Sequence, residues 1–391
     1  MGVRPNGFVG RHRSDRPTAF DLNWPVDVSF GRGALRNLAT VIAARPERRV
    51  LLVTSPSFGA RSSLLDTLAR HLDGREMRVF DGIKATPDID AVQGVIDFAR
   101  ASRVEAVIGM GGGSVMDAAK TAALLARTQW DLRTYLQEEP DTPPTPLHTI
   151  LIPTTAGSGS EVTRWATIWD TAGKRKLSVT LPRLPHRLAL LDPELTLTLP
   201  PLQTAISGAD ALAHAMEAYW SKNANPVSDS LALAAVHRIS THLFRAQQEP
   251  MNLEHRSEML LASLLAGLAF SQTQTAAAHA ISYPLTSHFG IPHGQATAIS
   301  LPVLLGFNAE VAPDLFAPLC RVLGAASVPE AQDRLRWLLE QVGLKTRLRD
   351  LGIPCHAQPL LAQAALTSNR LPNNLRSIGP EEMQRLLEEL W

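Results

Sequence analysis

Cysteine is nearly absent from this sequence, and other features that mark particular classes of protein are missing as well. The two cysteines among 391 residues, Cys320 and Cys355, form no CxxC pair. This spacing argues against a disulfide framework or a thiolate metal site, and it fits a reducing compartment. No apolar run is long enough to cross a bilayer. The first twenty residues are basic and lack the apolar middle of a secretory signal. We therefore expect a cytoplasmic protein in which residues 1–24 form a loose arm.

An excess of charge of either sign is also missing. The formal net charge is +1 at pH 7, which indicates neither a nucleic-acid partner nor an anionic membrane surface. The content of apolar residues, 45%, is typical of a globular protein. Because 391 residues exceed what one hydrophobic core usually serves, we expect two domains.

Short aliphatic runs alternate with helical patterns between residue 48 and about residue 200. The runs at 48–55, 78–80 and 104–110 indicate strands. Such alternation predicts a parallel sheet covered by helices, in which ligands bind beyond the carboxyl ends of the strands. From residue 203 onward, long helical patterns dominate. We therefore predict an α/β, Rossmann-like, dinucleotide-binding domain over 25–200 and an all-helical, metal-binding domain over 201–391.

Three consecutive glycines, Gly111, Gly112 and Gly113, stand between a predicted strand and a predicted helix. Without side chains they let a phosphate approach the backbone amides, and the helix N-terminus adds the positive end of its dipole. Ser114 and Asp117 have the spacing of a capping box. The alternative is a tight turn that needs glycine only for its geometry, and the spacing is not the GxGxxG fingerprint. The pattern still favours binding of a pyrophosphate.

A second loop rich in small residues follows another predicted strand. Hydroxyl groups come from Thr154, Thr155, Ser158 and Ser160. Between them, Gly157 and Gly159 are expected to let the backbone approach a ligand. Such a loop on its own is usually only a loop. Two of them at the carboxyl ends of strands in one sheet are better explained by a dinucleotide cleft.

One aspartate and three histidines occur in stretches that are rich in alanine or glycine and poor in charge. Asp210 and His214 are four residues apart in a helical pattern, so they share one helix face. His279 lies in a second helical pattern, and His293 follows a turn at the start of a third. A lone histidine is usually structural, but a buried aspartate is rare unless it is paired or binds a cation. The four side chains form a suitable ligand set for Fe²⁺ or Zn²⁺ with one position open for a substrate.

Taken in order, these motifs resemble those of the iron-dependent alcohol dehydrogenases, whose fold is shared with dehydroquinate synthase and glycerol dehydrogenase. The resemblance runs from about Pro25 to at least Pro302 through VSFGRGALRNL, GGGSVMDAAK, IPTTAGSGSEVT, LLDPELT, GADALAHAMEAY and IPHGQA. It implies a dehydroquinate synthase-like fold, a homodimer, and iron bound by Asp210, His214, His279 and His293. It also implies that NAD(H) or NADP(H) is held by Gly111, Gly112, Gly113, Ser114, Asp117, Thr154, Thr155 and Ser158.

Two positions depart from the pattern of that family. Tyr283 stands where many members have a histidine near the nicotinamide. A tyrosine titrates near ~10 rather than ~6.5, so the proton would come through water, a cofactor ribose hydroxyl or Tyr283. The first strand ends in Thr54 and Ser55, where many members have an aspartate that binds the adenosine ribose. Since that change removes repulsion against a 2′-phosphate, we expect NADPH to be accepted, with Ser55 in the cofactor site.

Further segments resemble the phosphonoacetaldehyde reductases of phosphonate metabolism, namely RWATIWD, HAISYPL and SNRLPNN. This resemblance implies reduction of phosphonoacetaldehyde to 2-hydroxyethylphosphonate. Arg164 directly follows the second glycine loop, where its guanidinium is expected to bind the phosphonate bidentately. Arg370 is a second candidate, for which we prefer a surface or interdomain ion pair.

The chemistry expected from these residues is hydride transfer between nicotinamide C4 and a carbonyl carbon that the metal polarises. Three alternatives remain. A cyclase of the dehydroquinate synthase type needs a pocket rich in Lys and Arg, and the helices around Asp210 and His279 contain few. A polyol dehydrogenase of the glycerol type would have to be distinguished by its substrates. A non-catalytic nucleotide or metal sensor is disfavoured by the complete ligand set.

Overall fold

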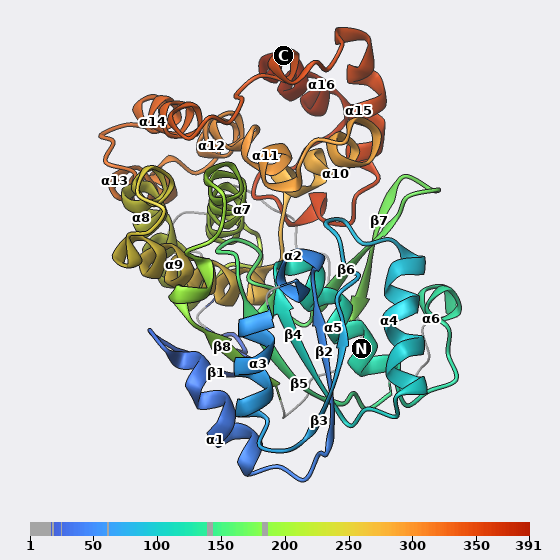
Figure 1. The fold of residues 1–391 in the computed structure, drawn as a ribbon. Coiled ribbons are helices and arrows are strands. Elements are labelled where there is room, and N and C mark those ends of the chain that lie inside the picture. The colour runs from blue at the N-terminus through green and yellow to red at the C-terminus, as the bar shows by residue number, and fades with distance from the viewer. Residues whose placement is uncertain (1–16, 18, 25, 61, 139–143, 182–186) are drawn as a thin grey trace.

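A six-stranded parallel sheet forms the centre of the N-terminal half in the computed structural model (Figure 1). The structure describes residues 17, 19–24, 26–60, 62–138, 144–181 and 187–391. The strand order is β1-β8-β5-β4-β2-β3, and every neighbouring pair is parallel. The strands are β1 Asp27–Phe30, β2 Arg49–Thr54, β3 Glu76–Phe80, β4 Ala106–Gly111, β5 His148–Pro153 and β8 Arg187–Leu191. The predicted α/β architecture is confirmed.

Strand β2 shows why the sheet is covered on both faces. Its alternate side chains point to opposite sides. Val50 and Leu52 pack with α1 and α3, whereas Leu51 and Val53 pack with α4 and α5. These helices are α1 Asn37–Ala43, α3 Ser62–His71, α4 Ile89–Ala101 and α5 Gly113–Leu125; the short helices α2 Pro56–Gly59 and α6 Leu132–Glu138 lie in the same half. Because both faces are buried, the strand is a continuous aliphatic run.

An antiparallel hairpin that the sequence analysis did not predict follows the second glycine loop. It consists of β6 Trp165–Asp170 and β7 Arg175–Thr180. The hairpin rises from the α/β half, and β7 contacts α10 of the helical half (Figure 1). It therefore carries side chains of the first half to the helices that hold the histidines.

Helices make up the second half. They are α7 Pro201–Trp220, α8 Pro226–Gln248, α9 Leu253–Thr273, α10 Ala277–Phe289, α11 His293–Ala298, α12 Leu301–Ala309, α13 Pro313–Val322, α14 Val328–Gln341, α15 Gln358–Leu366 and α16 Pro380–Leu390. Helix α7 is buried almost all round by α8, α9 and α11, and its many alanines permit this close packing. No described helix combines the length and apolar character that a membrane span requires.

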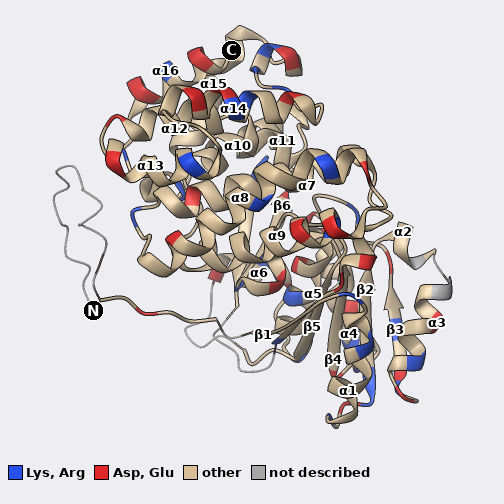
Figure 2. Ribbon diagram, turned by 90° about the vertical axis from the view of Figure 1, so that its left-hand side faces the viewer, with Lys and Arg blue, Asp and Glu red and all other residues tan. Residues whose placement is uncertain are grey.

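The charged residues of both halves are mixed in sign. Figure 2 shows residues of both signs on the helices and strands of both halves. This distribution agrees with the net charge of +1.

The last described residues of the N-terminal arm are docked. The indole Nε1 of Trp24 donates to the carbonyl oxygen of Leu268 and to the hydroxyl of Ser271, both at 3.1 Å on α9. The expectation of a loose arm is therefore wrong for this end of it. Residues 1–16, and the predicted domain start at residue 25, lie outside the described residues.

The second glycine loop joins the two halves. A Cβ atom on Gly157 would lie 2.8 Å from the Cβ of Ser207 on α7. At Gly159, where φ is +59°, it would lie 2.6 Å from the Cα of Gly267 on α9. The expectation that these two glycines open the backbone to a ligand is therefore wrong, because their missing side chains make room for helices of the other half.

Candidate active site

One cavity of about 540 Å³ lies between the two halves. One of its ends is lined by residues from the glycine loops and the end of β2, including Ser55, Gly112, Gly113, Ser114, Asp117, Thr155 and Ser158. Its other end is lined by Asp210, His214, His279 and His293. The structure thus brings most of the predicted cofactor residues and all four predicted metal ligands into one space.

The first glycine loop departs from the predicted capping box. Helix α5 begins at Gly113, and Gly112 is its N-cap residue without a side-chain hydrogen bond. The capping box of Ser114 and Asp117 is therefore wrong, since both residues lie inside the helix. A Cβ atom on Gly113 would come within 2.8 Å of the Cβ of Ser158. The two loops consequently approach each other at the helix N-terminus, where backbone amides are free to bind an anion.

Two predicted cofactor residues do not line the cavity. Gly111 is the last residue of β4, and its carbonyl oxygen accepts a hydrogen bond from the amide of Thr154 at 2.9 Å. Thr154 is itself buried, with 4% of its surface exposed. Their hydrogen bond joins the end of β4 to the end of β5, so these two residues hold the bases of the two glycine loops together.

A buried ion pair fixes the two loops and the hairpin to one another. Lys120 is fully buried, and its ammonium group lies 2.9 Å from Oδ1 of Asp117 and donates to the carbonyl oxygens of Ser160 and Trp165. Asp117 also accepts from the hydroxyl of Ser160 at 2.5 Å and from the amide of Thr167 at 2.8 Å. Asp117 lines the cavity, as predicted for a cofactor residue. Because its carboxylate oxygens already bind these protein donors, we assign it the role of holding the cavity wall in place.

Glu161 is expected to contribute stability at pH 5 that is lost as the pH rises to 8. Only 1% of this residue is exposed, and no other described residue donates a hydrogen bond to its carboxylate. Burial raises the pKa of Glu161 from 4.5 to about 7. Between these two values the folded protein holds a proton that the unfolded chain has released. The contribution of Glu161 to the free energy of unfolding therefore decreases with rising pH, by roughly 3 kcal/mol at most.

Chemical denaturation at pH 5 and pH 8 would measure this effect. The variant Glu161→Gln has no proton to lose, so it is expected to lose less stability than the original protein over the same range. Equal losses in both proteins would contradict this explanation.

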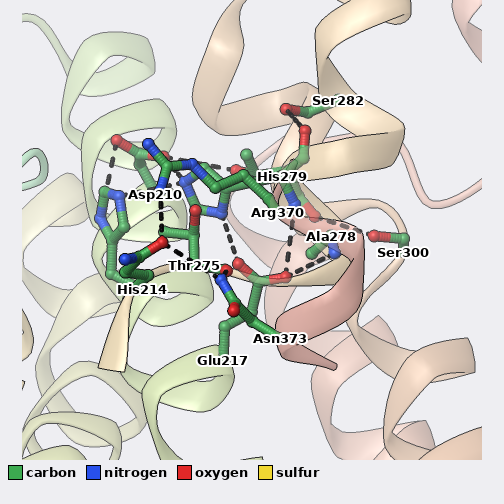
Figure 3. Close-up of polar contacts among 12 residues, drawn as sticks. Asp210, His214, Glu217, Thr275, Ala278, His279, Ser282, Ser300, Arg370 and Asn373 are labelled. Carbon is green, nitrogen blue, oxygen red and sulfur yellow. Dashed lines mark hydrogen bonds and ion pairs between the residues drawn. The ribbon is translucent and has the colours of Figure 1, made fainter. Parts of the chain in front are cut away.

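The four predicted ligands converge at the other end of the cavity, and Figure 3 shows three of them, Asp210, His214 and His279. Ligand atoms of Asp210, His279 and His293 all lie within 4.8 Å of one another. The Nε2 atoms of His279 and His293 are 4.0 and 3.9 Å from Oδ1 of Asp210. His214 completes the group, since its Nε2 atom is 3.0 Å from that of His279. Its Nδ1 atom lies 3.2 Å from the carbonyl oxygen of Gly157, which can only accept, so Nε2 keeps its lone pair for a metal.

Burial keeps two of the four candidate ligands in the neutral form that binds a cation. It lowers the pKa of both His279 and His293 well below the usual value of 6.5, so these imidazoles are neutral. Burial also raises the pKa of Asp210, while the nearby His214 and Lys176 lower it. One carboxylate and three imidazoles from α7, α10 and α11 suit Fe²⁺ or Zn²⁺. The residues present therefore fit the metal that the sequence resemblance implies.

Glu217 is a functional residue that the sequence analysis missed. It is fully buried, and its Oε2 atom accepts a hydrogen bond from Nδ1 of His279 at 2.5 Å (Figure 3). Oε1 accepts from the amide of Ala278. Burial raises the pKa of Glu217 to about 7. The signal was present in the sequence, because Glu217 lies seven residues after Asp210 and three after His214, on the same face of an apolar helix.

Aromatic and basic side chains enclose the space beside the histidines. The rings of Trp169 and Tyr283 lie 6.4 and 6.2 Å from that of His293. The ammonium group of Lys176, on β7, lies 4.5 Å from the centre of the Tyr283 ring. Arg370 lines the same cavity. The sequence analysis did not identify Lys176, because it lies on the hairpin that was not predicted.

Arg164 does not reach this space. Its side chain is exposed, and it is not among the residues that line the cavity. Trp165, the next residue, does line it. The guanidinium carbon of Arg164 lies 5.7 Å from the centre of the Trp165 ring, so Arg164 is near the cavity wall without being part of it. The expectation that Arg164 faces the substrate must therefore be corrected, and Arg370 is the arginine in the cavity.

Comparisons with known proteins agree with this geometry. The model of the iron-containing alcohol dehydrogenases matches residues 25–193, and that of the C-terminal part of the Fe-containing alcohol dehydrogenase family matches residues 204–391. Long-chain-alcohol dehydrogenase 1 of Geobacillus thermodenitrificans is 35% identical, with 87% of this chain and 89% of the relative covered. Sulfoacetaldehyde reductase of Bilophila wadsworthia is 32% identical, with 92% and 96% covered.

A solved structure shows the same fold. The sulfoacetaldehyde reductase of Bifidobacterium kashiwanohense, in complex with NAD⁺, superimposes with a TM-score of 0.89 at 31% identity. The superposition covers 96% of this chain and 99% of that protein. Family models that together span nearly the whole chain agree with the ligand set found in the cavity. The chain therefore belongs to the iron-containing alcohol dehydrogenase family and is an oxidoreductase.

Proposed function

We propose that this enzyme reduces phosphonoacetaldehyde to 2-hydroxyethylphosphonate with NADH or NADPH. The observation that carries the proposal is the presence of Arg370 and Lys176 in the cavity that also contains the metal-binding residues. Two cations beside neutral imidazoles favour an aldehyde that carries an anionic group. Two relatives of this chain are named for an aldehyde with a sulfonate group, which supports a small anionic aldehyde as the substrate class.

The residues of the chain bind and orient the reactants in this proposal. When bound, the dinucleotide supplies the hydride and the iron supplies Lewis acidity at the carbonyl oxygen. The glycine loops hold the dinucleotide, and Asp210, His214, His279 and His293 hold the metal. Tyr283 lines the cavity, and its hydroxyl can pass a proton to the product oxygen directly or through water. Trp165, Trp169 and Phe270 line the remaining wall and limit the access of bulk water.

The experiment measures NAD(P)H oxidation by protein that has been loaded with Fe²⁺ under anaerobic conditions. Phosphonoacetaldehyde, sulfoacetaldehyde and propanal are compared at equal concentrations. We expect kcat/KM for phosphonoacetaldehyde to exceed that for propanal by about 10–100-fold, since a charge-assisted hydrogen bond contributes ~1.5–3 kcal/mol. Equal values would discard the phosphonate role and keep the dehydrogenase. No net oxidation with any aldehyde would favour a cyclase or a sensor.

A pair of arginine variants tests which side chain recognises the anion. The guanidinium carbons of Arg164 and Arg370 lie 5.7 and 5.8 Å from the centre of the Trp165 ring, but only Arg370 lines the cavity. Arg370→Met is expected to lower the preference for phosphonoacetaldehyde over propanal about tenfold or more. Arg164→Met is the matched control and is expected to keep the preference. The reverse result would restore the assignment made from the sequence.

NADPH is expected to be accepted at the far end of the cavity. Ser55 and Ser57 line that end with their hydroxyl oxygens 3.0 Å apart, and the exposed Lys84 lines it as well. These groups can donate hydrogen bonds to a 2′-phosphate. The neighbouring Thr54 is not available, because its hydroxyl donates to the carbonyl oxygen of Met110.

Steady-state kinetics with both nucleotides would check this expectation. Ser55→Asp places a carboxylate beside the 2′-phosphate, so kcat/KM for NADPH is expected to fall about tenfold or more while that for NADH changes little. A large preference of the unmodified enzyme for NADH would contradict the prediction.

A homodimer is part of the proposal. Strand β1 is at the edge of the sheet among the described residues, and it exposes 42% of Val28 and 36% of Phe30. Exposed edges of this kind are usually covered or paired. Light scattering coupled to gel filtration would measure the mass, and a monomer would refute this part.

A further inference from the structure

Gln274 adopts a backbone conformation that is rare for any residue other than glycine. It follows the last turn of α9 with φ 62° and ψ 173°. This region of the Ramachandran plot is almost restricted to glycine, because a Cβ atom clashes there. Such strain persists only where the surroundings impose it, and it is common at ligand-binding positions. The contacts of the Gln274 side chain are therefore expected to explain why this strained backbone conformation is kept.

The amide group of Gln274 holds the guanidinium of Arg370. Oε1 of Gln274 accepts a hydrogen bond from Nη1 of Arg370 at 2.7 Å and another from Nδ2 of Asn373 at 3.4 Å. On another side, the ring of Trp165 lies 5.8 Å from the guanidinium carbon. Gln274, Trp165 and Arg370 all line the cavity. A neutral acceptor and an aromatic ring thus orient the guanidinium without neutralising it.

The same turn places Arg370 relative to the metal-binding residues. Gln274 lies five residues before His279, and Asn373 donates from Nδ2 to the carbonyl oxygen of Thr275 at 2.9 Å. Figure 3 shows Arg370, Thr275 and Asn373 together beside His279 and Asp210. Arg370 lines the same cavity as Asp210, His214, His279 and His293. An anion held by Arg370 would therefore be close to a carbonyl group at the metal.

The charge of Arg370 is otherwise unused within the protein. None of the ion pairs found among the described residues involves it, although Glu217, Asp210 and His279 form such contacts nearby. Arg has five N–H donors, and among the described residues Gln274 is the acceptor of one of them. The other donors can bind a planar or tetrahedral oxyanion.

We propose that Gln274 is a specificity-determining positioning residue, whose strained backbone aims Arg370 at the anionic group of the substrate. The inference rests on the proposed function in that it assigns the anion of the substrate to Arg370. Glycine at position 274 would relieve the strain and stabilise the fold. It would also remove the amide oxygen that holds the guanidinium of Arg370, which would then be mobile. The strain is thus a cost in stability that improves recognition of the anion.

The test compares Gln274→Gly with Gln274→Ala. Both variants remove the amide acceptor, but only glycine relieves the backbone strain. The probe is methylphosphonate, and its Kd is measured by calorimetry on the enzyme loaded with iron and cofactor. We expect both variants to weaken binding about 3–10-fold and Arg370→Met to weaken it about tenfold or more. The melting temperature of Gln274→Gly is expected to rise by about 1–4 °C and to exceed that of Gln274→Ala.

Each result bears on either the inference or the proposed function. Unchanged Kd values in the Gln274 variants would overturn the inference, as would a Gln274→Gly protein that melts below the original. Binding of methylphosphonate that does not depend on Arg370 would also overturn it. If Kd values shift as expected but phosphonoacetaldehyde is turned over no better than propanal, the substrate proposal fails and the role of Gln274 stands. If the substrate preference holds and the Gln274 variants retain it, only the inference fails.

Discussion

Replacement of His214 by alanine is expected to abolish iron binding and to lower turnover by about a thousandfold or more. The Nε2 atom of His214 faces that of His279 at 3.0 Å, and its Nδ1 atom is committed to the carbonyl oxygen of Gly157. The lone pair on Nε2 is therefore available to a metal. Lewis acidity contributes several kcal/mol of transition-state stabilisation, and each ~1.4 kcal/mol corresponds to a factor of ten in rate.

The measurement is the iron content per protomer after anaerobic loading, together with kcat. Because the ring of His214 also stacks on Phe270 with centroids 4.2 Å apart, alanine leaves a cavity. His214→Gln fills more of that space and is the second variant; it is expected to lose iron as well. His356→Ala, at an exposed histidine, is the control and should retain both iron and turnover. A His214→Ala enzyme that is free of metal and fully active would refute the metal-dependent mechanism.

The parts of this molecule that the sequence predicts well depend on local patterns. Strand β2 was recognisable because both of its faces are buried, which requires a continuous aliphatic run. The four candidate metal ligands were recognisable because polar groups in apolar helices need a partner or a cation. In both cases burial restricts which residue types can occur, and that restriction is visible without knowledge of the fold.

The missed features depend on contacts between distant residues. Glu217 meets His279 across 62 positions, and Gln274 meets Arg370 across 96. Sequence patterns indicate which face a residue occupies but not what lies opposite that face. Arg164 was preferred over Arg370 because it is adjacent to the glycine loop in the sequence, whereas its side chain is exposed and does not line the cavity. The hairpin that carries Lys176 was missed because its strands are short and do not join the six-stranded sheet.

Replacement of Glu217 by glutamine is expected to lower the affinity for iron about 10–100-fold. Both carboxylate oxygens are acceptors, one for Nδ1 of His279 and one for the amide of Ala278. Glutamine has only one acceptor and a donating amino group. If its oxygen satisfies the buried amide, the amino group faces Nδ1 of His279. That nitrogen must then accept, so the proton of the imidazole moves to Nε2, which loses the lone pair that binds metal.

Titration with Co²⁺, followed by its visible absorption, would measure this effect without relying on turnover. Glu217→Gln is expected to bind Co²⁺ more weakly and with an altered spectrum, because one imidazole leaves the coordination sphere. Glu389→Gln, at an exposed glutamate of α16, carries the same chemical change on the surface and should bind normally. Glu217→Asp keeps both acceptors, so partial recovery of affinity is expected. Normal Co²⁺ binding by Glu217→Gln would mean that His279 presents Nε2 to the metal without help from the carboxylate, and Glu217 would then contribute to packing alone.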